Sequence, residues 1–204
     1  MKKVYIYKGF ERFWHWMQAF LIFLLAGTGF EIHGSFSFFG FENAVRFHNA
    51  AALSLIALIV FAIFWHFTTG EWRQYIPTRE HLRAQIEFYL TGIFRNAPHP
   101  TKKTLLSKLN PLQRLVYLSL KLLVIPVMVS SGLLYMVYRY SGPHHIETFQ
   151  IFSLKYVALW HVAGAFVVVA FVIAHLYLIT TGQTPTSNLK AMITGYEDIE
   201  GHEQ

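Results

Sequence analysis

The feature that most constrains this chain is an apolar segment near its carboxyl end, residues Leu159–Thr181, which contains His161 and His175. As a helix, this segment is long enough to cross a hydrocarbon core of about 30 Å. The two histidines would then lie nearly four turns and roughly 21 Å apart, within about 40° of one face. Polar side chains are costly inside a membrane, so both imidazoles need partners. Each could donate to a neighbouring polar group, or both could be metal ligands.

Three further apolar segments are long enough to span a membrane. With the first, they predict spans at about 10–30, 43–68, 112–138 and 155–181. Only 14% of the residues are charged, compared with about 25% in soluble domains. We therefore expect an all-α integral membrane protein. Residues 1–204 would form one domain, a four-helix bundle with short interfacial helices, and Pro126 should kink its third span.

Lys and Arg residues are unevenly distributed between the connecting segments. They are frequent in the amino-terminal lead and in the long loop between the second and third spans, and sparse in the other two loops. Because cytoplasmic loops carry this excess, both termini and the long loop should be cytoplasmic. The same bias explains the net charge of +6. No nucleic-acid partner is expected, because the basic residues are not interleaved with an aromatic platform.

Histidines in other spans match the depths of the two on the fourth span. His48 lies five or six residues inside the outer end of the second span, and His161 about six inside the fourth. His15 and His175 each lie about five residues from a cytoplasmic end. The chain has no cysteine, which excludes iron–sulfur clusters and covalent c-type haem, so histidine would hold any iron. Two bis-histidine haems are therefore predicted, a ligation that suits electron transfer.

Residues close to these histidines are candidates for the haem environment. Gly164 lies one turn after His161, and Gly132 lies near the outer side of the third span. Without a β-carbon they would admit a flat macrocycle, although ordinary helix packing explains each glycine equally well. Arg12 and Arg46 each precede a candidate ligand. They are expected either to pair with propionates or to anchor the helices at the interface.

The other histidines are expected to have different roles. His66 lies two residues before a Thr-Thr-Gly boundary, shallower than His175. A propionate, a quinone or water is therefore its expected contact, with iron ligation as the alternative. The rest should be solvated rim, loop or tail residues; they are His33, His81, His99, His144, His145 and His202.

Short motifs occur in a fixed order along the spans. They are Arg12-x-x-His15-Trp16, Arg46-Phe-His48, Asn110-x-x-Gln113-Arg114, the His161 and His175 spacing, and Lys190-Ala-Met-Ile-Thr-Gly195. In order and spacing they resemble the membrane cytochrome b subunits of respiratory formate dehydrogenases and nickel–iron hydrogenases, and the related thiosulfate-reductase-type cytochromes b, all bacterial cytochrome b561-like proteins. The resemblance covers all four spans.

The resemblance implies specific roles for these residues. His48 and His161 would hold an outer haem b, and His15 and His175 an inner one. Asn110 and Gln113 would belong to a quinone site. The family has a glycine between those two positions, where this chain has Pro111-Leu112.

The resemblance also implies a cellular setting. Electrons would pass between a quinone, menaquinone or ubiquinone, and an iron–sulfur or multihaem cytochrome c subunit attached to a catalytic subunit. The site would be the bacterial inner membrane, surrounded by lipid, and electron flow in either direction fits the residues. Any enzymatic role would be confined to quinone chemistry. A haem-free structural anchor or assembly subunit is the alternative. A transporter fits less well, because Pro126 is the only broken-helix signal.

Overall fold

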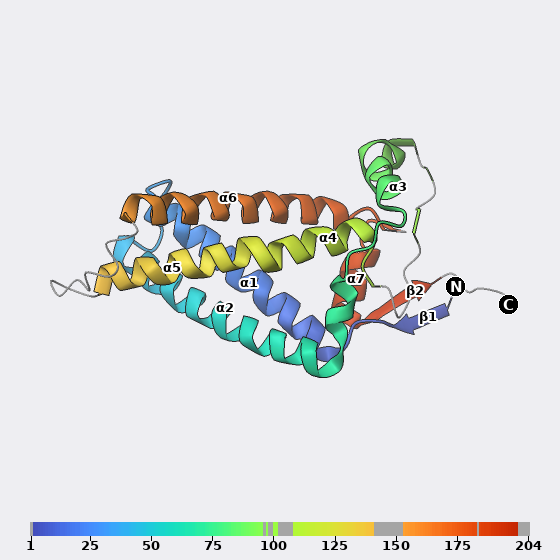
Figure 1. Cartoon of the computed structure of the whole chain (residues 1–204), viewed down its shortest axis with the longest axis horizontal. Coiled ribbons are helices and arrows are strands. Elements are labelled where there is room, and N and C mark those ends of the chain that lie inside the picture. The colour runs from blue at the N-terminus through green and yellow to red at the C-terminus, as the bar shows by residue number, and fades with distance from the viewer. Residues whose placement is uncertain are drawn as a thin grey trace. The chain divides into compact units, whose positions relative to one another are not determined.

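The computed structural model describes residues 2–95, 97, 100–101, 108–140, 153–182 and 184–199. Four helical segments among them are long and apolar enough to cross a membrane (Figure 1). They are α1 (Gly9–Ile32), α2 (Phe41–Thr69), the segment Pro111–Tyr140 and α6 (Leu154–Ile179). The prediction of a helical protein with four long apolar helices is confirmed. His99, His144, His145 and His202 lie outside the described residues.

The chain forms two compact units, and all four of the long helical segments contribute residues to both. Unit 1 consists of Met1–Trp16, Ala62–Leu120 and Ala174–Gln204. Unit 2 consists of Met17–Phe61 and Lys121–Ile173. Each unit contains one of the two histidine pairs that the sequence predicts, so each is described by itself.

The third apolar segment is interrupted close to Pro126, where the sequence predicts a kink. Its helix α4 (Pro111–Ser119) is followed by a π-helical turn, η4 (Leu120–Val124), and then by α5 (Ile125–Tyr140). Proline has no N–H to donate and its ring crowds the preceding turn. The wider turn that directly precedes Pro126 is a usual way to accommodate such an irregularity.

Unit 1 contains a two-stranded sheet that the sequence did not predict. Strand β1 (Lys2–Tyr5) pairs antiparallel with β2 (Tyr196–Ile199), so that Lys2 lies opposite Ile199. Helix α7 (Ser187–Thr194) ends directly before β2 at Gly195, whose φ is 87°. The Gly195 carbonyl accepts hydrogen bonds from the N–H groups of Ile6 and Tyr7. This glycine therefore joins the two ends of the chain.

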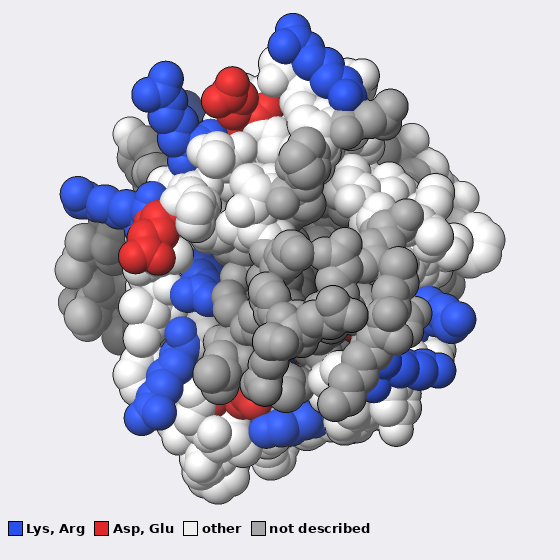
Figure 2. Space-filling model, turned by 90° about the vertical axis from the view of Figure 1, so that its right-hand side faces the viewer, with Lys and Arg blue, Asp and Glu red and all other residues white. Residues whose placement is uncertain are grey.

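Short helices between the second and third spans complete unit 1. They are η1 (Glu71–Tyr75), α3 (Leu82–Glu87), η2 (Phe88–Gly92) and η3 (Ile93–Arg95). Helix α4 packs against both α3 and η1. Figure 2 shows Lys and Arg side chains around the face that carries β1, β2 and α3, with fewer acidic ones. The cytoplasmic location of this face stays a prediction.

A cluster of four charged residues holds unit 1 together. The Lys108 ammonium lies 2.7 Å from Glu11 Oε1 and 3.1 Å from Glu71 Oε2, and its side chain is buried. Lys8 Nζ lies 2.9 Å from Glu71 Oε1. The pKa of Glu71 is lowered: burial alone would raise it, but the hydrogen bonds and charges of Lys8 and Lys108 outweigh burial. The cluster connects α1, η1 and the segment before α4.

In unit 2, small buried residues mark the helix faces that carry the candidate ligands. On α2 the buried positions include Ala44 and Ala51, three or four residues to either side of His48. On α6 Val157 and Gly164 are buried, and they flank His161 in the same way. Because residues three and four apart share a helix face, both histidines lie on buried faces.

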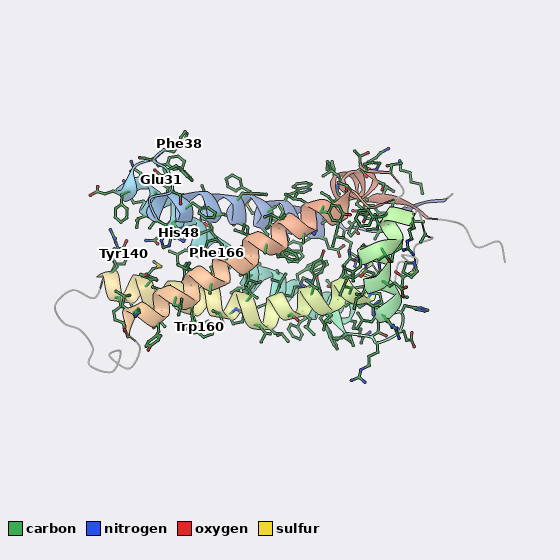
Figure 3. The ribbon with its side chains drawn as sticks, turned by 90° about the horizontal axis from the view of Figure 1, so that it is seen from above. Glu31, Phe38, His48, Tyr140, Trp160 and Phe166 are labelled. Carbon is green, nitrogen blue, oxygen red and sulfur yellow. The ribbon has the colours of Figure 1, made fainter. Side chains whose placement is uncertain are left out.

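The connection between α1 and α2 is held by one buried carboxylate. Glu31 Oε1 accepts hydrogen bonds from the backbone N–H groups of Phe38, Phe39 and Gly40, at 2.7, 2.7 and 2.8 Å. Figure 3 shows Glu31 and Phe38 at this end of α1. The three bonds fix where α2 begins, seven residues before His48.

Large apolar side chains point outward from the long helices. Phe64 on α2 is 67% exposed and Ile173 on α6 is 64% exposed. Soluble proteins rarely expose apolar surface on this scale. Lipid is the environment that such a surface fits.

We expect Gly195→Ala to destabilise the protein by about 1–3 kcal/mol, because an alanine is strained at positive φ. A β-carbon there would also lie 2.8 Å from the Tyr7 carbonyl oxygen. Gly27→Ala is the matched control, since a β-carbon on that helical glycine meets nothing within 4 Å. Thermal unfolding in detergent should show a lower Tm for the first variant and an unchanged or raised Tm for the second. Equal Tm values would contradict the role of Gly195.

We expect Lys108→Met to destabilise the protein by roughly 2–3 kcal/mol at pH 7, because two carboxylates lose a buried counter-charge. Lys8 still neutralises part of Glu71, which limits the loss. Since the pKa of Glu71 is lowered in the folded protein, its stabilising effect is present above pH 4.5 and is lost as the pH falls through the folded pKa.

The Tm difference between the wild-type protein and Lys108→Met should therefore shrink as the pH is lowered from 7 to 4. The exposed Lys190→Met removes the same charge and serves as control. A difference that grows at low pH would contradict the ion-cluster assignment.

Candidate functional site

The unit 2 pair consists of His48 on α2 and His161 on α6. Their ring centroids lie 6.3 Å apart, with 66° between the ring planes. Figure 3 shows the side chain of His48 among the helices rather than on their outer surface. The residue before His161, Trp160, is 62% exposed, as expected when its neighbour faces inward. The structure thus brings together the two histidines that were matched by depth.

His48 forms a hydrogen bond with a hydroxyl group on α1. Its Nδ1 lies 3.0 Å from Thr28 Oγ1. That hydroxyl lies 2.7 Å from the carbonyl oxygen of Leu24, one turn earlier, and donates its hydrogen there. Because a hydroxyl has a single hydrogen, Thr28 can only accept from the imidazole. Nδ1 of His48 therefore carries the proton, and Nε2 of the neutral ring has a free electron pair.

His161 has the same arrangement with a hydroxyl on α5. Its Nδ1 lies 3.0 Å from Ser131 Oγ, which donates to the carbonyl oxygen of Val127 at 2.6 Å. By the same argument, Nδ1 is the protonated nitrogen of His161 and Nε2 is the unprotonated one. Thr28 and Ser131 are functional candidates that the sequence reasoning missed.

A glycine follows each of these hydroxyl residues and contacts the same imidazole. A β-carbon on Gly29 would lie 3.6 Å from Cε1 of His48. On Gly132 it would lie 3.4 Å from Cε1 of His161. The two glycines therefore allow the helix backbones to approach the ring edges. Gly132 was predicted near the ligands, and Gly29 was not.

The unit 1 pair consists of His15 on α1 and His175 on α6. Their ring centroids lie 6.2 Å apart, with 51° between the ring planes. Nδ1 of His175 lies 3.4 Å from the hydroxyl of Tyr117 on α4. Nδ1 of His15 is buried, and the described part of the chain offers it no hydrogen-bond partner. The second pair predicted from depth is thus also brought together, with different hydrogen bonds.

Both ring separations fit one metal ion between two imidazoles. Metal–imidazole bonds are about 2.0–2.1 Å long, so two of them plus the two ring radii span roughly 6 Å. Among the described residues, no group of three or more His, Cys, Asp or Glu could hold a metal ion. An ion at either pair would have two protein ligands, as iron has in a bis-histidine haem. The residues present fit haem.

The two predicted arginines differ in their surroundings. Arg12 Nη1 donates to the carbonyl oxygen of Ile193 at 2.6 Å, which ties α1 to α7. Its Nε is buried and has no hydrogen-bond partner within the described ranges. Arg46 is exposed. The contacts with propionates stay predictions for both.

Gly164 contacts a neighbouring helix. A β-carbon there would lie 2.6 Å from Sδ of Met128 on α5. The structure therefore shows close helix packing at this glycine, which was one of its two expected roles. Its contact with a macrocycle stays a prediction.

Asn110 and Gln113, expected in a quinone site, form the capping box of α4. The Asn110 side chain accepts from Gln113 N at 2.8 Å, and the Gln113 side chain accepts from Asn110 N at 3.0 Å. Asn110 Nδ2 also donates to the Tyr89 hydroxyl at 2.9 Å. The signal was present in the sequence, since Asn-Pro-x-Gln before an apolar run is typical of a helix start.

His66 is buried, 7% exposed, and both of its ring nitrogens have partners. Nδ1 lies 2.6 Å from the Ala62 carbonyl oxygen, which can only accept, so Nδ1 is protonated. Nε2 lies 3.3 Å from the Tyr75 hydroxyl and accepts from it. Trp14 contacts the ring edge at 5.3 Å between centroids. His66 is therefore held by the protein itself. His33 and His81 are exposed, as predicted.

Comparison with known proteins adds independent information. A family model described as prokaryotic cytochrome b561 matches residues 6–195. The chain is 32% identical over 203 residues to a protein of Escherichia coli (strain K12) named "Putative cytochrome YdhU", covering 96% of this chain and 75% of that protein. No solved structure matches the chain. The family match includes all four paired histidines.

We expect Tyr75→Phe to destabilise the protein by about 1–3 kcal/mol, because Nε2 of the buried His66 loses its donor. His66→Gln should destabilise it by a similar amount. Neither variant should change the haem-to-protein ratio measured from the pyridine haemochrome spectrum. His175→Gln is the comparison that should lower the ratio. Loss of a haem in His66→Gln alone would make His66 a ligand and contradict this assignment.

Proposed function

We propose, because the chain belongs to the prokaryotic cytochrome b561 family, that it is a dihaem electron carrier of a respiratory complex. The family binds haem b, and the chain is accordingly a multi-pass membrane protein of electron transfer. The two-haem stoichiometry, the quinone reaction and the partner complex are the parts proposed here.

The observation that carries the proposal is the equal separation of the two ring pairs, 6.3 and 6.2 Å between centroids. Each pair joins α6 to a different helix, α2 in unit 2 and α1 in unit 1. The four histidines would thus provide two ligands for each of two haems. Haem, when bound, would supply a one-electron redox couple. The chain would supply the histidine ligands and the polar groups around them. Two histidines per iron leave no open position, which favours electron transfer over oxygen binding.

Helix α6 contributes a histidine to both proposed haem sites. It carries one ligand of each pair, His161 and His175, in a single helix from Leu154 to Ile179. An apolar helix of this length is a candidate membrane span. A chain that holds a haem near each end of such a helix can pass electrons from one side of the membrane towards the other.

The quinone and the partner subunits are inferred from the family resemblance. We place the quinone reaction, with menaquinone or ubiquinone, next to the unit 1 pair on the cytoplasmic side. The phenol of Tyr117, which lies beside His175, supports this choice, because a quinone needs hydrogen-bond donors. An iron–sulfur or multihaem cytochrome c subunit, bound to a catalytic subunit in the bacterial inner membrane, would exchange electrons with the unit 2 pair.

We expect the purified protein to contain about two b-type haems per chain. His161→Ala should remove the haem of the unit 2 pair and spare the other, and His15→Ala should do the reverse. The pyridine haemochrome spectrum gives the ratio, and a redox titration of the reduced α-band resolves the two haems. The exposed His33→Ala is the control and should keep both.

Two results would count against the proposal in different ways. A wild-type ratio near zero would favour a haem-free anchor. A full ratio in both His161→Ala and His15→Ala would leave the haem protein in place and refute the ligand assignment.

A further inference from the structure

We infer that Thr28 and Ser131 are positioning residues that hold both imidazoles of the unit 2 pair, each with Nδ1 protonated and Nε2 unprotonated, the form that could bind a haem iron. The inference rests on the proposed function, in which this pair binds a haem. Neither residue would itself bind iron, and each would act through the histidine that it contacts.

The hydroxyl groups of Thr28 and Ser131 form hydrogen bonds in a defined direction. Each hydroxyl already donates to a carbonyl oxygen one turn earlier in its own helix, at 2.7 Å from Thr28 and 2.6 Å from Ser131. Thr28 is 1% and Ser131 5% exposed, so water does not compete for the hydroxyls. Each can only accept from the imidazole 3.0 Å away. The opposite tautomer, protonated at Nε2, would lose this bond and could not bind iron through Nε2.

The same arrangement of a hydroxyl group and a glycine against one imidazole occurs twice, in independent parts of the sequence. Thr28-Gly29 lies on α1 and Ser131-Gly132 on α5, neither of which is the helix that carries its histidine. In both, the hydroxyl meets Nδ1 while the glycine admits the Cε1 edge of the same ring. A single such contact could be incidental packing. Two hydroxyl–glycine dipeptides, one against each ring of the pair, indicate a shared role.

The hydrogen bonds of the unit 1 pair differ from those of the unit 2 pair. There Nδ1 of His175 lies 3.4 Å from a phenol oxygen, and Nδ1 of His15 has no partner among the described residues. The unit 2 pair therefore has partners of a different kind from the phenol beside His175, and the unit 1 haem can serve as an internal control.

The expected effect follows from the hydrogen bond that a metal-binding imidazole donates through its other ring nitrogen. A bond donated from Nδ1–H makes Nε2 a stronger electron donor and fixes the ring orientation. The hydroxyl is a better acceptor because it is polarised by its own bond to the carbonyl. A stronger donor favours the ferric state, so these bonds should lower the reduction potential at the unit 2 pair. Losing one of them should weaken haem retention at that pair by roughly 10–100-fold.

The test uses the full-length protein with its haems bound. Thr28→Val and Ser131→Ala remove the two hydroxyl acceptors separately and leave the backbone carbonyls of Leu25 and Met128 beside the rings. Thr28→Ser and Ser131→Thr restore a hydroxyl. The haem of the unit 2 pair is identified as the one missing in His161→Ala. A redox titration, low-temperature electron paramagnetic resonance and the haem-to-protein ratio are then recorded for each variant.

We expect Thr28→Val and Ser131→Ala to raise the potential of that haem or to lose it selectively, with the unit 1 haem unchanged. The conservative variants should restore the wild-type values. Unchanged potentials and spectra in both variants would overturn the inference while the dihaem function stood. Equal loss of both haems in both variants would also overturn it, because the hydroxyls would then support the fold. A wild-type protein without haem would instead refute the proposed function.

Discussion

Every imidazole inside these apolar helices needs a polar partner, and that need determines which residues surround it. A buried polar group without a hydrogen bond costs several kcal/mol in lipid, where no water can replace the partner. The structure meets the need at three histidines with hydroxyl groups: Thr28 for His48, Ser131 for His161, and Tyr75 for His66. Nδ1 of His15 has no such partner among the described residues. Thr28 and Ser131 are satisfied in turn by carbonyl oxygens of their own helices. These side-chain hydrogen bonds therefore connect neighbouring helices, while the backbone carbonyl oxygens involved keep hydrogen-bond partners.

Helix packing follows from the same arrangement. The buried faces of α2 and α6 carry small residues such as Ala44, Ala51 and Gly164, while large side chains such as Phe64 and Ile173 point outward. In a soluble protein the large apolar residues would be expected inside. Lipid contact reverses this preference, and small interior residues allow close helix approach. The two rings of the unit 2 pair can then come within 6.3 Å.

The sequence predicted the features that depend on local patterns. Four apolar runs gave the long helices, and helix periodicity with depth matching brought His48 to His161 and His15 to His175. The strands β1 and β2 were not predicted, because four residues at each end of the chain pair only through tertiary contact. Thr28 and Ser131 were missed because a hydroxyl in an apolar helix bonds its own backbone as readily as a neighbour. Asn110 and Gln113 form a capping box that their sequence pattern also indicates. Their place in a quinone site, which the family resemblance implies, stays a prediction.

Burial changes the acidity of the phenol groups in unit 1. In unit 1, burial raises the pKa of Tyr75, and the neighbouring Tyr117, Glu11 and Glu71 raise it further. Its phenol therefore stays protonated near neutral pH and acts as a fixed donor to His66. Burial raises the pKa of Tyr89 as well, although the hydrogen bond from Asn110 opposes the shift. A quinone bound there, as proposed, would meet phenols that keep their protons near neutral pH.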